Sequence, residues 1–197
     1  MIKKEIKKVF KPIVIRIFIL YVNVKFKYIK SKLKNKKNKN RYIILTLTSY
    51  PKRFKNLNLT LKCLLMQNEP VDYVVLWVSY EDFKELPESV LCLRKYGLKI
   101  EKTKDIKSYK KIIPAIKKYK GYGYITVDDD LYYSKNLVSN LLEISKNSPG
   151  CVVANRVHEV TLDRQKKILP YKEWSWNSVD STSERNFFTS GAGTFFP

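Results

Sequence analysis

Strand-like apolar runs alternate with helix-like segments from residue 42 to residue 154. The expected strands are 42–48, 71–78, 98–103, 124–127 and 151–154. The expected helices, in which apolar residues recur every three or four positions, are 54–66, 87–96, 108–119 and 135–147. The segment 108–119 is expected to be interrupted at Pro114. Because this alternation is typical of parallel strands joined by crossover helices, it predicts an α/β fold with a mostly parallel sheet flanked by helices.

Two polar segments follow expected strands directly. Thr48, Ser49 and Tyr50 come after the first strand, and Asp128, Asp129 and Asp130 come after the fourth. In sheets of this kind, ligands bind beyond the carboxyl ends of the strands. We therefore expect the two segments to lie in one pocket.

The three consecutive aspartates indicate a cation site. If strand alternation continues through them, Asp128 and Asp130 point to one side and Asp129 to the other. Two neighbouring carboxylates repel each other, and a hard divalent cation such as Mg²⁺ or Mn²⁺ is their simplest compensation. The alternative is a polar turn that caps the next helix, but a cap needs one Asp, and Ser134 is better placed for it.

The net charge of +21 is concentrated near the N-terminus. Residues 1–41 hold 15 Lys and Arg and one acid, so they carry +14, and the other +7 belongs to residues 42–197. A strongly basic chain could bind nucleic acid or be a nuclease that uses the same carboxylates, and this alternative remains open. Since no nucleic-acid-binding motif is present, we expect no specific nucleic-acid partner.

Residues 1–30 are predicted to form a basic amphipathic helix. One face carries Ile2, Ile6, Val9, Ile13, Ile17, Leu20, Val24 and Tyr28. The densest apolar part is too short and too polar to span a bilayer. The pattern favours a helix lying on an anionic membrane surface, with packing on the rest of the protein or on a partner as the alternative. Residues 31–41 read as a charged linker, and residues 42–197 as the folded domain.

The three cysteines do not form a motif. Their odd number and wide spacing favour neither a disulfide framework nor a zinc site. A reducing compartment is the simplest inference. Together with the basic helix, it predicts a cytoplasmic protein that is peripheral on the inner face of the cell membrane.

Several stretches, taken in order, resemble bacterial glycosyltransferases of the GT-A fold, of the cell-surface-polysaccharide type. They are 45–53, 108–115, 125–133 with its Asp-x-Asp motif, 156–158 followed by 170–174, and 191–197. The resemblance implies a GT-A-like, Rossmann-like fold. It also implies a metal-dependent enzyme that transfers a sugar from a nucleotide sugar, first of all a UDP-sugar, to a surface glycan, with Mn²⁺ or Mg²⁺ as cofactor.

The resemblance and the strand-end rule together give a set of candidate residues. The expected donor-binding residues are Thr48, Ser49, Tyr50, Arg53, Lys110, Lys111, Asp128 and Asp129. The expected metal ligands are Asp128, Asp130 and His158, and the expected sugar or acceptor contacts are Trp174, Ser190, Gly191 and Gly193. The alternatives are solvated lysines at 110 and 111, a structural role for His158, core packing for Trp174, and turn glycines.

The family pattern continues beyond the position of Pro197. It includes an acidic pair near a Trp that would supply the catalytic base, and none of Asp163, Glu173, Asp180 or Glu184 stands in the matching place. The resemblance therefore implies a C-terminally truncated domain whose catalytic base is absent and whose activity is impaired. The alternative is a membrane-associated, non-catalytic fragment that binds the donor.

Overall fold

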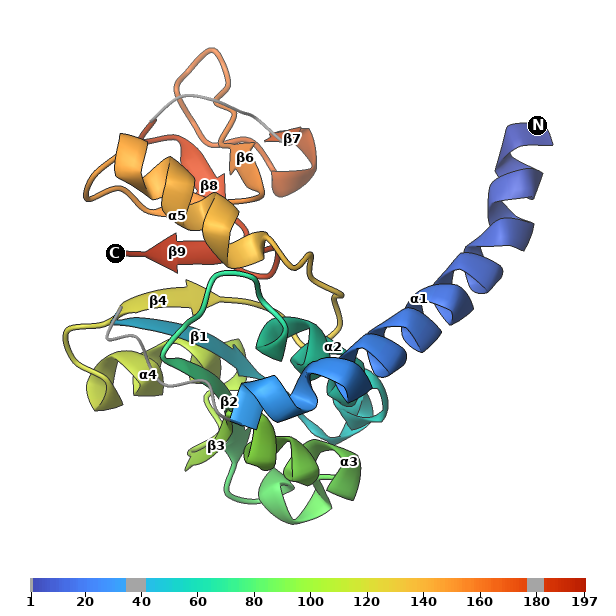
Figure 1. Ribbon diagram of the computed structural model, residues 1–197. Helices are drawn as coiled ribbons and strands as arrows, with labels where there is room; N and C mark the ends of the chain where they lie inside the picture. The colour runs from blue at the N-terminus through green and yellow to red at the C-terminus, as the bar shows by residue number, and fades with distance from the viewer. Residues whose placement is uncertain (1, 35–41, 177–182) are drawn as a thin grey trace.

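The fold is built on a six-stranded, mostly parallel sheet. The computed structural model describes residues 2–34, 42–176 and 183–197 (Figure 1). The strand order is β3-β2-β1-β4-β9-β5. The bounds are β1 (Ile43–Thr48), β2 (Tyr73–Ser79), β3 (Leu98–Thr103), β4 (Gly123–Thr126), β5 (Val153–Ala154) and β9 (Thr194–Phe196). The first four strands of this order pair in parallel, and β9 is antiparallel to both β4 and β5. The predicted fold class, α/β with a mostly parallel sheet flanked by helices, is confirmed.

Helices cover both faces of the sheet. The helices are α1 (Ile2–Lys34), α2 (Phe54–Leu65), α3 (Glu88–Leu91), α4 (Ile113–Lys118) and α5 (Leu137–Asn147). Short 3-10 helices are η1 (Pro51–Arg53), η2 (Asp82–Glu85), η3 (Cys92–Tyr96), η4 (Lys107–Lys111) and η5 (Tyr171–Glu173). All of the α-helices except α4 contribute to the larger core cluster, while α4 packs in a second cluster with Ile44, Val75 and Trp77.

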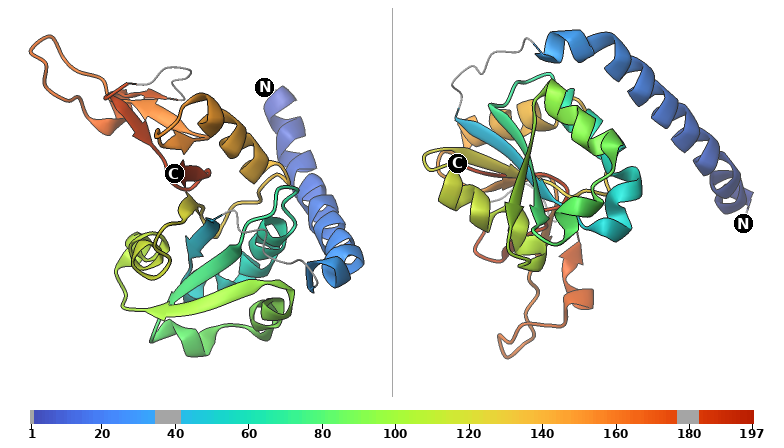
Figure 2. Two further views of the ribbon diagram at one scale, coloured as in Figure 1. Left: turned by 60° about the vertical axis from the view of Figure 1, so that its left-hand side comes forward. Right: turned by 90° about the horizontal axis from the view of Figure 1, so that it is seen from below.

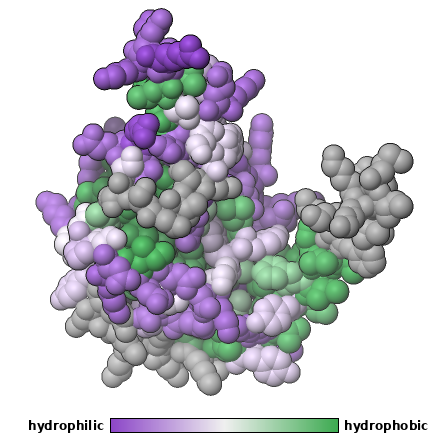
Figure 3. Space-filling model, turned by 90° about the horizontal axis from the view of Figure 1, so that it is seen from above, coloured by the Kyte–Doolittle hydropathy of each residue, from purple (hydrophilic) through white to green (hydrophobic). Residues whose placement is uncertain are grey.

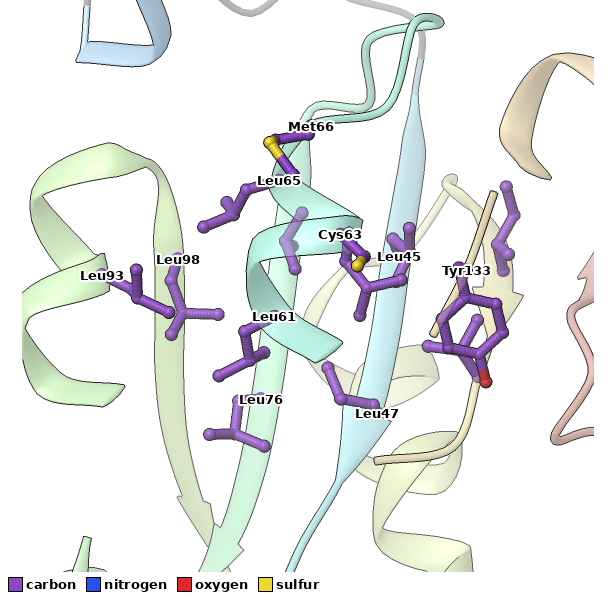
Figure 4. Close-up of a cluster of buried hydrophobic side chains, with 14 of the residues drawn as sticks. Leu45, Leu47, Leu61, Cys63, Leu65, Met66, Leu76, Leu93, Leu98 and Tyr133 are labelled. Atoms are coloured by element: carbon purple, nitrogen blue, oxygen red, sulfur yellow. The ribbon is translucent and has the colours of Figure 1, made fainter. Parts of the chain in front are cut away.

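Alternation along β1 explains this two-sided core. Leu45 and Leu47 point toward α2, where they meet Leu61 and Cys63 (Figure 4). Ile44 belongs to the cluster on the opposite face. Every one of these side chains is less than one-tenth exposed. Burial of apolar area on both faces is what makes the parallel sheet stable.

Two expected helices are divided in the structure. The segment 87–96 becomes α3 followed by η3, and the segment 108–119 becomes η4 followed by α4. Pro114 lies in the first turn of α4, where a missing backbone N–H is tolerated. The interruption predicted at Pro114 is thus confirmed, and the proline lies at the beginning of a new helix.

The N-terminal helix packs on the domain mainly through Val22 and Phe26, which lie outside the predicted stripe. Val22 and Phe26 are buried, and Phe18, Ile29 and Leu33 pack beside them on the larger core. The ring of Phe26 meets Tyr96 at 5.3 Å, and Lys62 Nζ donates a hydrogen bond to Asn23 Oδ1 at 2.7 Å. The helix extends to Lys34, beyond the expected boundary at residue 30, and residues 35–41 lie outside the described residues. Figures 1 and 2 show the C-terminal part of α1 lying against the outside of the domain and its N-terminal part projecting away from it.

None of the described helices has an apolar stretch of the length and hydrophobicity that crossing a bilayer requires. The face of the molecule seen in Figure 3 exposes both hydrophilic and hydrophobic residues.

A small second sheet follows β5 in the chain. It has the order β7-β6-β8, with β6 (Val157–Glu159), β7 (Ser175–Trp176) and β8 (Asn186–Phe188). All of its pairings are antiparallel. It lies beside α5 at the end of the molecule farthest from α3 (Figure 1).

The three free thiols differ in their surroundings, and this gives a first prediction. Cys63 is 4% exposed in the core, whereas Cys92 and Cys151 are partly exposed. Burial also raises the pKa of Cys63 to about 11. Because the thiolate is the reactive form, a disulfide reagent at pH 8 is expected to modify Cys92 and Cys151 quickly and Cys63 only after unfolding. Absorbance titration of native and urea-unfolded protein measures this, and rapid modification of three thiols in the native state would contradict it.

Candidate functional site

A cleft of about 470 Å³ opens beyond the carboxyl ends of β1 and β4. Its lining joins the strand-end segments with 3-10 helix η4 and with residues that follow β2 and β3. The lining residues are Thr48, Ser49, Tyr50, Pro51, Arg53, Asp82, Asp105, Lys107, Ser108, Lys110, Lys111, Asp128 and Asp129. The prediction that the segments 48–50 and 128–130 share one pocket is thus confirmed for Thr48, Ser49, Tyr50, Asp128 and Asp129.

Asp129 connects the two strand ends. Its carboxylate is 4% exposed and accepts hydrogen bonds from Ser49 Oγ at 2.6 Å and from Arg53 Nη1 at 2.7 Å. Its backbone oxygen accepts a further bond from Thr60 Oγ1 of α2 at 3.1 Å. A buried carboxylate is stable only when its oxygens accept hydrogen bonds. Asp129 therefore has a structural role in the site, where it ties the two strand ends together.

Arg53 contacts two of the three aspartates. Besides Asp129 it reaches Asp130 Oδ2 at 3.1 Å, and the hydrogen bond to Asp129 raises the pKa of Arg53. Asp130 is half exposed and does not line the cleft. Asp130 thus shares Arg53 with Asp129, and the metal pairing of Asp128 with Asp130 stays a prediction. Strand β4 ends at Thr126, so side-chain alternation does not extend into residues 128–130.

Asp128 lies between a lysine and a glycine. Lys111 Nζ donates to Asp128 Oδ1 at 2.7 Å, and the lysine side chain is only 9% exposed. The other oxygen, Oδ2, lies against Gly191, where an added Cβ would be 1.8 Å from it. Any side chain at position 191 would therefore displace the carboxylate. The backbone of Gly191 thus lies directly against Asp128, and the sugar or acceptor contact predicted for this glycine stays a prediction.

Two polar residues of the core set the position of Lys111. Trp77 Nε1 donates to Thr46 Oγ1 at 3.1 Å, and Thr46 Oγ1 donates to the backbone oxygen of Lys111 at 2.6 Å. Thr46 and Trp77 lie on neighbouring parallel strands, and both are almost fully buried. This chain anchors η4 to the face of the sheet, so the two lysines are built into the fold. The alternative of solvated surface lysines is thereby excluded for Lys110 and Lys111, which are 4% and 7% exposed.

Lys110 pairs with an acid that the sequence analysis did not select. Its Nζ lies 2.5 Å from Asp105 Oδ1, and Lys107 contacts the other oxygen of Asp105 at 2.8 Å. Hydrogen bonds from Lys107 and Lys110 lower the pKa of Asp105 well below its ordinary value. Asp105 follows β3, so the strand-end rule that selected Asp128 would also have found it.

Tyr133 holds the backbone around Asp128. Its hydroxyl accepts a hydrogen bond from the Asp128 N–H at 2.8 Å and donates one to the carbonyl oxygen of Gly191. Burial raises the pKa of Tyr133, which keeps the phenol protonated and able to donate. The tyrosine thus joins the segment 128–130 to the segment that enters β9.

Ser190 and Gly193 have structural neighbours. The carbonyl oxygen of Ser190 accepts a bond from Thr126 Oγ1 at 3.3 Å. Gly193 has a φ of 104°, and an added Cβ would be 2.6 Å from Leu137 Cδ1. Neither residue lines the cleft. Their positions explain how β9 fits beside β4, and the acceptor role predicted for them stays a prediction.

His158 and Trp174 belong to the small second sheet and its surroundings. His158 is 1% exposed, and its ring packs at 4.5 Å from Trp176 and 5.9 Å from Tyr171. Trp174 donates from Nε1 to the carbonyl oxygen of Leu169 at 2.8 Å and packs on Tyr171. Neither residue lines the cleft. The expected three-residue metal set is therefore wrong in including His158, whose ring is buried against Trp176 and Tyr171 and does not converge with Asp128 and Asp130.

The cleft is suited to a cation only if a ligand supplies further oxygens. Within residues 2–34, 42–176 and 183–197, no three His, Cys, Asp or Glu side chains converge as a metal-binding group. The oxygens of Asp128 and Asp130 are of the type that Mg²⁺ and Mn²⁺ prefer. These ions are commonly held by one or two carboxylates together with substrate phosphates. Asp128 and Asp130 fit that arrangement. They do not fit a site in which protein side chains alone surround the ion.

Comparison with known proteins gives a limited result. No protein-family model matches this sequence, and no curated protein matches it. A structural comparison finds the crystal structure of S. aureus TarS 1–349, with 22% sequence identity and a TM-score of 0.45. The match covers 56% of this chain and 33% of that chain. The function proposed below therefore rests on the residues of the cleft.

Proposed function

We propose that this protein is a metal-dependent glycosyltransferase that binds a nucleotide sugar, first of all a UDP-sugar, in the cleft at the ends of β1 and β4. The observation that carries the proposal is the ion pair between Lys111 and Asp128. Its two charged atoms are 2.7 Å apart, and it lies beside Lys110 at the carboxyl ends of the parallel strands. A diphosphate needs positive groups that are fixed in place before it binds. Buried lysines anchored through Thr46 meet that need.

The nucleoside end of the donor is assigned to the loop after β1. Tyr50 is 42% exposed at the cleft, and Arg53 lies 5.5 Å from the centre of its ring. An exposed aromatic ring beside a guanidinium suits the flat face of a nucleobase. Thr48 and Ser49 are held by Trp77 and Asp129, so they shape this end of the cleft.

Charge balance supports a cation that arrives with the donor. The lining contains four acids, Asp82, Asp105, Asp128 and Asp129, and four basic residues, Arg53, Lys107, Lys110 and Lys111. A diphosphate would add several negative charges to a lining whose formal charges already cancel. A Mg²⁺ or Mn²⁺ ion held by Asp128 and Asp130 would supply Lewis-acid stabilisation of the departing diphosphate.

The acceptor is proposed to be a surface glycan. The surroundings of the second sheet present exposed aromatic rings, among them Tyr171, Trp176 and Phe187. Trp174 packs at 5.3 Å from Phe187 and supports this group of rings. Aromatic faces suit the apolar CH faces of sugars. We therefore keep Trp174 in the acceptor proposal as a supporting residue.

Calorimetry of UDP-sugar binding with and without Mn²⁺ tests the proposal. Wild-type protein is expected to bind the donor at least about tenfold more tightly with Mn²⁺, and Asp130→Ala is expected to lose most of that gain. Glu143→Ala is the matched control, because Glu143 is an exposed carboxylate on α5 outside the cleft. If Asp130→Ala keeps the full Mn²⁺ effect, the metal role assigned to Asp130 is wrong. If wild-type protein binds no nucleotide sugar under either condition, the function itself is wrong.

A further inference from the structure

Helix α1 has two apolar faces, and only one of them is covered. Val22 and Phe26 are buried against the domain, with Phe18, Ile29 and Leu33 packed beside them. On the other side lies a set of exposed apolar residues, which we call the outer face: Ile13, Val14, Ile17, Leu20, Tyr21, Val24 and Tyr28. Their exposed fractions lie between 45% and 78%. A helix that served only to cover the core would not need this second face.

The outer face is continuous along the helix. At about 100° per residue its members fall within an arc of about 120°, and at 1.5 Å per residue it is about 22 Å long. Contiguous exposed apolar surface of this kind marks an interaction site.

Positive charge borders the outer face. Arg16 and Lys27 lie along one edge of the arc, and Lys25 lies along the other, where its Nζ contacts Tyr21 Oη at 3.1 Å. The sequence from Pro12 to Lys34 contains no acidic residue. An apolar stripe flanked by basic side chains matches the boundary between lipid tails and anionic headgroups.

We propose that α1 docks this protein on an anionic lipid bilayer through the outer face, while its opposite face stays packed on the domain. The helix lies in the membrane surface, with the outer-face side chains in the headgroup region and the basic residues on lipid phosphates. This inference does not depend on the proposed enzymatic activity. It assigns the sequence stripe Ile13, Ile17, Leu20, Val24 and Tyr28 to lipid and assigns Val22 and Phe26 to the domain.

Point substitutions test this better than deletion of the helix, because deletion would uncover the core beneath Val22 and Phe26. The test variant is Ile17→Ser/Leu20→Ser/Val24→Ser in the full chain. The matched control is Ile116→Ser/Ile144→Ser/Ile168→Ser, whose three side chains are exposed apolar residues on other elements. Circular dichroism of each variant verifies that the fold is kept.

Co-sedimentation with vesicles of phosphatidylcholine, with and without phosphatidylserine, is the measurement. We expect wild type and control to bind the phosphatidylserine vesicles, and the test variant to bind at least about tenfold less. Added salt is expected to weaken wild-type binding, because headgroup attraction is screened. Equal binding by test variant and control would overturn the proposal. So would a wild-type dimer that the test variant converts to a monomer with no vesicles present, since the outer face would then be a self-association surface.

Discussion

Replacing Asp129 by Asn is expected to lower the free energy of unfolding by about 2–4 kcal/mol. Asp129 is 4% exposed and accepts bonds from the buried Ser49 hydroxyl and from Arg53. The Asn amide offers one acceptor oxygen in place of two, so one of these donors is left without its partner. Arg53 is 41% exposed and can turn to water, which keeps the effect below the loss expected for a fully buried pair.

Urea unfolding followed by tryptophan fluorescence measures this change. Asp130→Asn is the matched control, because Asp130 contacts the same arginine but is 51% exposed. It is expected to change the free energy of unfolding by less than about 1 kcal/mol. Similar losses for the two variants would show that the buried bond between Ser49 and Asp129 contributes little to stability.

Gly191→Ala is expected to weaken nucleotide-sugar binding in the presence of Mn²⁺ by at least about tenfold. The new Cβ would be 1.8 Å from Asp128 Oδ2, so the carboxylate must leave its position beside Lys111. The backbone of Gly191 is not in the left-handed region, so the effect comes from this contact and not from backbone strain. Crowding of this kind also lowers stability, by about 1–3 kcal/mol.

A double-mutant cycle separates the local effect from general damage. In an Asp128→Ala background the carboxylate that the alanine would strike is gone. Gly191→Ala is then expected to add little to the binding loss caused by Asp128→Ala alone. Calorimetry of the four proteins measures the coupling. Additive losses would mean that Gly191 acts on binding by some route other than Asp128.

The sequence predicted the sheet well because each strand is bounded by its own local signals. The run from Ile43 to Thr48 and the run ending at Thr126 are short, apolar and rich in β-branched residues, and they pair in parallel as expected. The strand-end rule then brought Ser49 and Asp129 into one cleft. These features depend on local pattern and on one general property of parallel sheets.

Other features depend on contacts between distant segments, which no local pattern specifies. The contact of Gly191 with Asp128, and the packing of His158 in a separate sheet, require the three-dimensional path of the chain. In α1 the local pattern itself was ambiguous. Apolar residues occur on both faces, so periodicity identified the stripe through Ile17 and Leu20 but not the face through Val22 and Phe26 that packs on the domain.

The network around the aspartates also affects how the protein folds. Ser49 and Asp129 are 80 residues apart in sequence, and the hydroxyl of Tyr133 and the carbonyl of Gly191 are 58 residues apart. Each of these contacts closes a long loop, and the entropic cost of closing a loop rises with its length. If only β1, β2 and their helices had formed, neither the lysines of η4 nor the carboxylates that follow β4 would be held in position. The cleft therefore requires β4 beside β1, so it is complete only where this part of the central sheet is formed.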